Sequence, residues 1–246
     1  LGQFHGWINN NDIALDYLLK SSEKCKQIKD TVRVASTYRE IGRMFLEKKN
    51  LQLAKKYLRE AYQTDILINN TKGLAVDYNH LGVLYKHLNK TDRAYYFFDK
   101  SIQINERQGI PGLLAQALIN IATFEISRDR NEQGESLLLR ALGICDSIQN
   151  KKDFSTLVPI IYANLGVICK ERKQYAAAKS YFKQSLSLAG RDLDLNTLIR
   201  IEEGFSQCCR ELRDYEEAFT ADDRVHVLLD SNHTVDNRQN LMALEM

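Results

Sequence analysis

Cysteine and histidine have the most reactive side chains in this chain, so their spacing sets the chemistry open to them. The cysteines are Cys25, Cys145, Cys169, Cys208 and Cys209. The histidines are His5, His80, His87, His226 and His233. No C-x-x-C or H-E-x-x-H spacing occurs among them, so the pattern predicts no metal site. His80 and His87 lie two helical turns apart, which is typical of a surface pair.

Catalytic and cofactor-binding motifs are absent from the sequence as well. There is no G-x-S-x-G nucleophile turn, no phosphate-binding loop and no glycine-rich dinucleotide turn. The carboxylate pairs Glu202-Glu203 and Asp222-Asp223 lie on segments with helical character and imply no pocket. We therefore expect no catalytic residue, no cofactor and no enzymatic activity from this chain by itself.

The composition is that of an ordinary folded protein. Apolar residues make up 44% and charged residues 27% of the 246 residues, and the net charge is +2. This charge gives no reason to expect a nucleic acid partner. The longest apolar stretch, 157–169, is interrupted by Pro159, Asn164 and Gly166, so it reads as a buried helix. We expect any membrane attachment to come from segments outside this chain.

The elements that position these side chains repeat about every 40 residues. The repeats start at Ala35, Ala75, Ala115, Pro159 and Ile199, with one spacing of 44. The eighth position of each repeat is small: Gly42, Gly82, Ala122, Gly166 and Ser206. The twentieth is small too: Ala54, Ala94, Gly134, Ala178 and Ala218. The twenty-fourth is large in four repeats: Leu58, Phe98, Leu138 and Phe182.

This pattern predicts pairs of closely packed helices, which we name A and B within each repeat. Small residues let the two backbones approach, and large residues fill the remaining space. Short polar turns such as Lys48-Lys49-Asn50 join A to B and offer a capping side chain. Residues 1–21 fit the end of an earlier unit, so we infer that the chain opens inside a truncated repeat and that an upstream segment was removed or omitted.

The small and large positions resemble the tetratricopeptide repeat over about residues 1–229, with a period longer than the usual 34. They look like the long-helix variant found in kinesin light chains, cell-polarity adaptors and bacterial signalling proteins. The resemblance implies an all-α fold, a right-handed α-solenoid of helix-turn-helix hairpins over 1–230. It begins with a partial repeat at about 1–30, and a capping or linker helix follows over 231–246. Glu202 and Asp222 replace large residues in the last repeat, as expected where a terminal repeat faces solvent.

In the family, the A-helix face opposite the buried stripe lines a concave groove that binds peptides. The residues that we expect to line such a groove here are Arg39, Arg43, Asn79, His80, Lys86, Asn120, Thr123, Asn164, Lys170, Arg200, Gln207 and Arg210. Asn120 and Asn164 share the sixth position and resemble the asparagine ladder with which long-helix members hold a peptide backbone. The alternative is that these side chains are simply solvated.

The cysteines occupy recurrent packing positions. Cys25 and Cys145 share position 31, while Cys169 and Cys209 share position 11. A free cysteine at such a place behaves as a small hydrophobic residue. Of the adjacent pair we expect only Cys209 to face the core. Five unpaired thiols favour a reducing compartment, or an organism that lives without oxygen.

The segment at the end of the last repeat is the basis for the function that we expect. Leu228-Leu229-Asp230-Ser231 predicts that the last B helix ends near Asp230, before a polar helix over 235–246. This exit resembles the sensor region of Bacteroidetes-type membrane-anchored signalling regulators. The resemblance implies a periplasmic sensor that binds a protein or peptide and passes the signal to an output domain, with a homodimer as a further expectation. The alternative is a cytoplasmic scaffold or peptide-pheromone receptor, which the cysteines favour.

Overall fold

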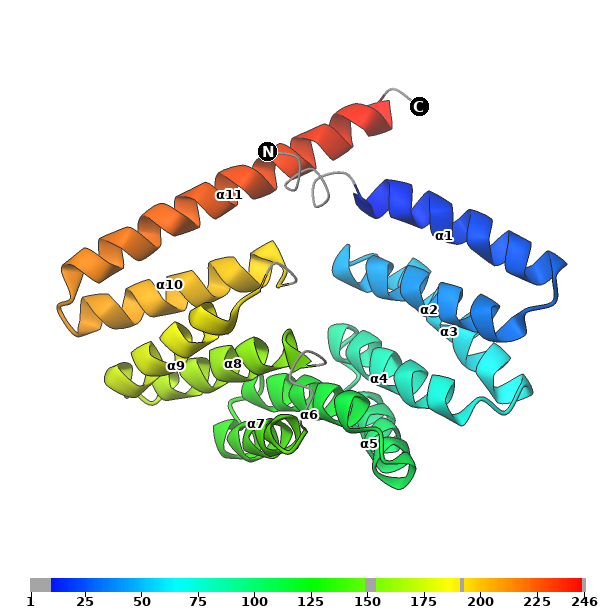
Figure 1. The fold of residues 1–246 in the computed structure, drawn as a ribbon, viewed down its shortest axis with the longest axis horizontal. Coiled ribbons are helices and arrows are strands. Elements are labelled where there is room, and N and C mark those ends of the chain that lie inside the picture. Colours follow the sequence, from blue (N-terminus) through cyan, green and yellow to red (C-terminus); the bar gives the residue numbers. More distant parts are fainter. Residues whose placement is uncertain (1–9, 149–153, 191–192, 245–246) are drawn as a thin grey trace. The chain divides into compact units, whose positions relative to one another are not determined.

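The computed structural model describes residues 10–148, 154–190 and 193–244, with side chains over 15–148, 154–190 and 193–230. Within these ranges the chain is all helical, which confirms the expected fold class. The helices are α1 (Asn10–Gln27), α2 (Thr31–Glu47), α3 (Leu51–Leu67), α4 (Thr71–His87), α5 (Thr91–Gln108), α6 (Pro111–Ile126), α7 (Asn131–Asp146), α8 (Leu157–Glu171), α9 (Tyr175–Leu188), α10 (Leu195–Glu211) and α11 (Tyr215–Leu244) (Figure 1).

The chain forms two compact units, Leu1–Asn120 and Ile121–Met246, and the boundary falls inside α6. The A helices of the repeats are α2, α4, α6, α8 and α10, and each is followed by its B helix. In unit 1, hairpins form from α2 with α3 and from α4 with α5. In unit 2, they form from α8 with α9 and from α10 with α11. Each described hairpin is therefore one repeat of the sequence pattern.

The pairing of a glycine with a large residue holds these hairpins together. A β-carbon on Gly42 would lie 2.6 Å from Cγ of Leu58, so only a hydrogen fits between α2 and α3. In unit 2, a β-carbon on Gly166 would lie 2.8 Å from the ring of Phe182, which belongs to α9. The same ring also meets Gly204 of the next A helix. The predicted roles of the eighth and twenty-fourth positions are confirmed at these contacts.

Eight of the turns between the described helices share one conformation. Residues with positive φ end the helices as follows: Lys29, Lys49, Asn69, Asn89, Gly109, Asp129, Lys173 and Arg213. At the end of α2, the amide of Asn50 donates to the carbonyl of Phe45 at 2.9 Å, and that of Lys49 to Leu46 at 3.0 Å. These two bonds and the left-handed Lys49 make up a Schellman C-terminal motif. The repeated turn reverses the chain after each such helix.

Side-chain caps start several of the following helices, as the turn sequences predicted. The Oδ1 atoms of Asp30, Asn50 and Asn70 each accept a bond from the amide three residues later, at 3.1 to 3.2 Å. Asp194 does the same at the start of α10, at 2.9 Å. Each cap satisfies a backbone donor that the helix itself leaves unpaired. The polar turn residues therefore stabilise the first turn of the helix that follows.

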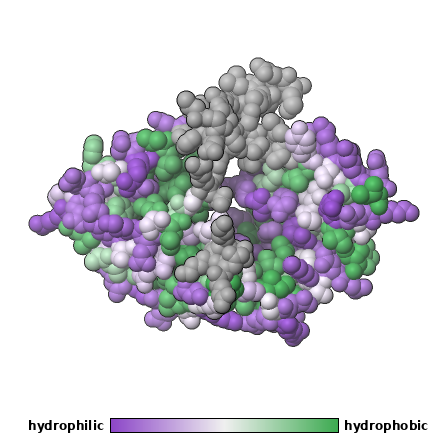
Figure 2. Space-filling view, in the orientation of Figure 1, coloured by the Kyte–Doolittle hydropathy of each residue, from purple (hydrophilic) through white to green (hydrophobic). Residues whose placement is uncertain are grey.

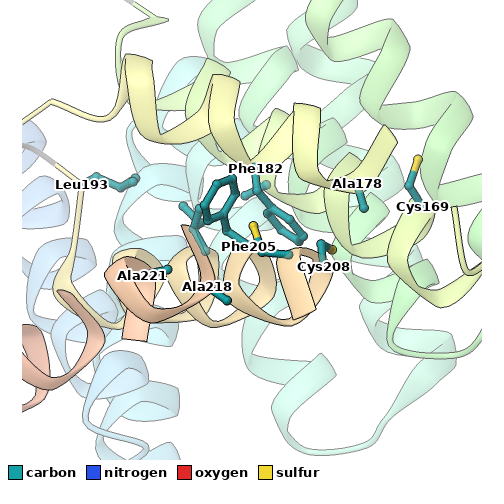
Figure 3. Packing of buried hydrophobic residues seen from close by; sticks show 11 residues of the cluster. Cys169, Ala178, Phe182, Leu193, Phe205, Cys208, Ala218 and Ala221 are labelled. Atoms are coloured by element: carbon teal, nitrogen blue, oxygen red, sulfur yellow. The ribbon is translucent and has the colours of Figure 1, made fainter. Parts of the chain in front are cut away.

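The core of unit 2 forms where α8, α9, α10 and α11 meet around Phe182 and Phe205 (Figure 3). All five cysteines are buried and unpaired, which confirms that they pack as small hydrophobic residues. Cys208 differs from expectation, because it is as fully buried as Cys209. Helix α10 has helices on more than one side, so adjacent residues on it are both covered. On the face shown in Figure 2, hydrophilic and hydrophobic residues are interleaved.

The end of the last repeat differs from the sequence-based expectation in two ways. Helix α11 continues through the expected end at Asp230 and runs to Leu244. Glu202 is only 5% exposed, so it does not face solvent as expected, and Asp222 is half-buried. Glu202 instead accepts two bonds from Arg224, at 2.7 and 2.9 Å, and Ser206 donates to Asp222 at 2.6 Å. Polar pairs thus replace apolar contacts between α10 and α11.

Candidate functional site

The A helices of unit 1 are linked by polar side chains that the sequence assigned to a groove. Nδ2 of Asn120, on α6, donates to Oδ1 of Asn79, on α4, at 3.0 Å. Asn79 is 6% exposed, whereas Asn120 is half-buried. The two amides therefore bridge neighbouring A helices. Asn120 and Asn164 were predicted to form an asparagine ladder. In unit 1, Asn120 pairs with Asn79.

Arg39 lies in the interior and not on the expected face, because it is only 8% exposed. Its guanidinium pairs with Asp65 of α3, and its Nε lies 2.6 Å from Oδ1 of Asp77 on α4. Asn70 adds a bond from Nδ2 to Asp65 at 2.8 Å. Both carboxylates are fully buried. Arg39 therefore joins three helices and is held away from any ligand.

One guanidinium balances two carboxylates in this buried group, which leaves an excess negative charge. Oδ2 of Asp77 has no hydrogen-bond partner. Burial raises the pKa of Asp77 to about 7, although the Arg39 cation acts in the opposite direction. The group therefore changes its protonation state near neutral pH.

Arg43 and His80 lie beside this group and remain partly accessible. Nε of Arg43 donates to Glu40 at 3.0 Å, and one terminal nitrogen pairs with Glu47. Burial, followed by the Arg39 and Arg43 cations, lowers the pKa of His80 to about 3, so its imidazole is neutral. His80 was expected to form a surface pair with His87. His87 is exposed, but Nδ1 of His80 is buried and has no partner.

His80 lines a cavity of about 120 Å³ that lies within unit 1. Three A helices contribute to its wall, and α5 supplies Ser101 and Asn105, which are 0% and 1% exposed. The lining residues are Arg43, Ala75, Val76, Asn79, His80, Ser101, Asn105, Leu113 and Gln116. Three of the predicted groove residues, Arg43, Asn79 and His80, therefore meet at one place.

In unit 2, the predicted groove residues differ in how far their side chains are exposed and in which hydrogen bonds they make. Asn164 is 4% exposed, and its Nδ2 donates to the carbonyl of Ile160 in its own helix at 2.9 Å. Nζ of Lys170, on α8, donates to Oε1 of Gln207, on α10, at 3.0 Å. This bond again bridges neighbouring A helices, as Asn79 and Asn120 do in unit 1.

The other predicted groove residues are at least partly accessible. Arg200 and Arg210 of α10 are exposed, and Arg210 pairs with Asp222. Lys86 and Thr123 are half-buried. Nowhere in the described residues do three His, Cys, Asp or Glu side chains gather as a metal site. Among those residues, no helix combines the length and hydropathy needed to span a bilayer.

Four polar residues of this region were not predicted from the sequence: Asp65, Asp77, Ser101 and Asn105. A usable signal was present, because Asp65 and Asn105 share position 31 with the packing cysteines. A charged or amide residue at a recurrent core position must find a buried partner or border a cavity. Asp65 does the first through Arg39, and Asn105 does the second.

The fold and the polar A-helix surfaces define a helical-repeat protein. Sequence models of the tetratricopeptide repeat match residues 113–191 and 78–108. The chain therefore contains tetratricopeptide repeats over these residues. A comparison with curated protein sequences finds no match.

Solved structures share the fold at low sequence identity. The crystal structure of BtubC from P. vanneervenii is 16% identical with a TM-score of 0.69, covering 91% of this chain and 92% of that one. The apo quorum sensor NprR from B. thuringiensis is 20% identical with a TM-score of 0.67, covering 87% of this chain and 60% of that one. NprR in complex with its cognate peptide NprX is 18% identical with a TM-score of 0.67, covering 94% and 66%. The chain thus spans about two thirds of NprR.

Proposed function

We propose that this chain is a non-enzymatic binding module that holds a protein or peptide segment against its A helices. One observation carries this proposal: polar side chains bridge neighbouring A helices in both units, through Asn79 with Asn120 and through Lys170 with Gln207. Side chains held in this way are pre-organised, which lowers the entropy lost on binding. Amides can also pair with the backbone of an extended peptide without reading its sequence.

A sensory role in a bacterial signal-transduction or transcription regulator is the more specific form of this proposal. Its support is the C-terminal exit sequence and the fold shared with the quorum sensor NprR. A soluble receptor for a peptide signal is the second candidate. The similarity to NprR with its cognate peptide favours it.

The binding proposal is tested with a peptide selected from a random dodecamer library on the intact chain. Asn120→Ala is expected to weaken binding roughly three- to tenfold, since one hydrogen bond contributes about 0.5–1.5 kcal/mol. Gln52→Ala, which removes an exposed amide from the B helix α3, is the matched control and should leave the affinity unchanged. Equal affinity for the wild type and Asn120→Ala would reject the A-helix surface as the site.

The two forms of the proposal make different predictions about the gene and the compartment. A secretion signal upstream and a membrane helix downstream in the full reading frame support the periplasmic sensor. Their absence, with recovery of the protein from the cytosolic fraction, supports the soluble receptor. Crosslinking and pull-down of the intact gene product from its native host would then identify the bound protein or peptide.

A further inference from the structure

We propose that the cavity between α4, α5 and α6 binds a primary carboxamide, the side chain of an asparagine or glutamine in the bound peptide. This inference rests on the proposed peptide-binding function and adds a specificity to it. The cavity has a volume of about 120 Å³, the space of about four waters at roughly 30 Å³ each. It therefore admits a carboxamide together with the carbon that carries it.

Asn105 lines the cavity and carries an acceptor of fixed orientation. Ser101 donates its hydroxyl hydrogen to the carbonyl of Ala75 at 2.7 Å, so its oxygen can only accept a further bond. Nδ2 of Asn105 donates to that oxygen at 3.3 Å, which fixes the orientation of the Asn105 amide. Oδ1 of Asn105 is then left without a partner, although the residue is only 1% exposed. A buried acceptor of this kind needs a donor.

His80 is a second lining residue with an unmatched polar atom. Its Nδ1 is buried without a partner, and its imidazole is neutral beside Arg39 and Arg43. A neutral imidazole has one nitrogen that donates and one that accepts. A carboxamide supplies both kinds of group within one planar unit, so it can satisfy Nδ1 in either tautomer. Gln116 lines the same cavity and offers a further amide.

The charges around the cavity favour a neutral occupant over a carboxylate. The only guanidinium in the described wall is that of Arg43, which Glu40 and Glu47 already pair. A carboxylate would also place its oxygens against Oδ1 of Asn105, where both partners are acceptors. An ammonium group offers donors only, so it cannot serve Nδ1 of His80 when that nitrogen carries the hydrogen. An uncharged group with two donors and an acceptor fits these surroundings best.

The first test uses propionamide on the ¹⁵N-labelled full chain and follows the imidazole nitrogens by NMR. Propionamide should shift Nδ1 of His80 saturably at millimolar concentration. Propionate and N,N-dimethylpropionamide should give no saturable shift at tenfold higher concentration. The exposed His87, on the same helix, is an internal control whose signals should stay in place. A cavity that holds water only would give no saturable shift with propionamide and would overturn the proposal.

Variants then locate the binding. Asn105→Leu and His80→Phe should each abolish the propionamide-dependent change in the spectrum of the chain, whereas His87→Phe should leave it intact. Two independent cavity variants are used because either one alone can perturb folding, and the dispersion of the amide spectrum checks that each is folded. An unchanged response in both folded variants would place the amide elsewhere and reject the cavity.

The second test separates this inference from the proposed function. Peptides selected on the wild type should be enriched in asparagine or glutamine at one position. Changing that residue to alanine should raise the Kd about tenfold for the wild type and less than twofold for Asn105→Leu. Selected peptides without that enrichment would refute the cavity specificity and leave peptide binding standing. Propionamide binding without any selected peptide would support the cavity and refute the peptide-binding function.

Discussion

A β-carbon on Gly82 would lie 2.6 Å from the ring of Phe98, so the absence of a side chain at Gly82 sets how closely α4 approaches α5. Phe98 is fully buried. We expect Gly82→Ala to destabilise the protein by about 1–3 kcal/mol, because overpacking a filled core forces side chains off their preferred rotamers. Urea unfolding followed by circular dichroism measures this change.

Gly143 of α7 is the control for this prediction. A β-carbon there would meet nothing within 4 Å. Gly143→Ala should raise the free energy of unfolding by about 0.5–1 kcal/mol, because alanine loses less backbone freedom than glycine in a helix. If both alanine variants changed stability equally, the close approach at Gly82 would not be what limits the packing.

The buried group around Arg39 predicts a pH dependence of stability. The pKa of Asp77 is raised to about 7 in the folded protein, above its usual 3.8. Between these values the folded state holds a proton that the unfolded state has released. The contribution of Asp77 is therefore fully present below about pH 4 and is lost as the pH rises through 7. His80, whose pKa is lowered from 6.5 to about 3, acts in the opposite direction over part of this interval. The urea midpoint of the wild type minus that of Asp77→Asn should therefore fall from pH 4 to 8.

Asp77→Asn removes this titrating group and keeps His80, so the difference between the two proteins isolates the contribution of Asp77. Asp99→Asn, at an exposed position on α5, is the control and should keep the wild-type slope. A wild-type midpoint that rises between pH 4 and 7, with the same rise in Asp77→Asn, would show that Asp77 is ionised throughout and that Arg39 overcomes the effect of burial.

The repeated turn allows a test of backbone strain in both directions. Lys49 has a φ of 56° and Gly109 a φ of 62°, at equivalent ends of α2 and α5. The left-handed conformation costs free energy for a residue with a β-carbon, whereas glycine adopts it without this cost. Lys49→Gly should therefore stabilise the protein by about 0.5–1 kcal/mol, and Gly109→Lys should destabilise it by a similar amount. Thermal and urea unfolding of the two variants check the signs.

The outcome for Gly109→Lys is free of packing effects, because nothing lies within 4 Å of the position its β-carbon would take. Lys29→Gly supplies an independent repeat of the first experiment, since Lys29 has a φ of 58°. Destabilisation by both lysine-to-glycine changes would mean that the lysine side chains make contacts worth more than the strain that they impose.

The repeat, the hairpins and the glycine contacts could be predicted from the sequence, because they depend on residues at fixed spacing within one period. The burial of Arg39 could not. Its partners Asp65 and Asp77 lie 26 and 38 residues away, on two other helices. Arg39 and Asn79 were both expected to line the groove, yet both are buried. Neighbouring A helices touch, so the covered stripe is wider than one hairpin requires.

The residues of the candidate site could likewise be predicted from the sequence only in part. The sequence identified Arg43, Asn79 and His80 as residues of one face, because their repeat positions place them there. It did not reveal the cavity, which also needs Ser101 and Asn105 from a B helix. These two residues occupy positions that point inward, and only packing determines whether an inward polar residue is enclosed by apolar neighbours or borders a space.

The polar contacts of the last hairpin can be replaced by the apolar ones of the other repeats. Glu202 is 5% exposed and depends on Arg224, whose side chain is 46% exposed. Arg224→Met alone leaves a buried carboxylate without its cation. We expect a loss of about 1–2 kcal/mol, less than for a fully buried pair because solvent reaches the Arg224 side. Urea unfolding, monitored through the protection of the α10 amides from hydrogen exchange, measures this loss in the free energy of unfolding.

Adding Glu202→Leu to Arg224→Met should restore the stability, because the corresponding position in another A helix is the buried Leu118. The double variant removes both polar partners together, so neither the carboxylate nor the guanidinium is left unmatched between α10 and α11. Stability equal to or above that of the wild type is the expected result. A double variant no more stable than Arg224→Met would show that the ion pair orients α11 in a way that apolar packing cannot replace.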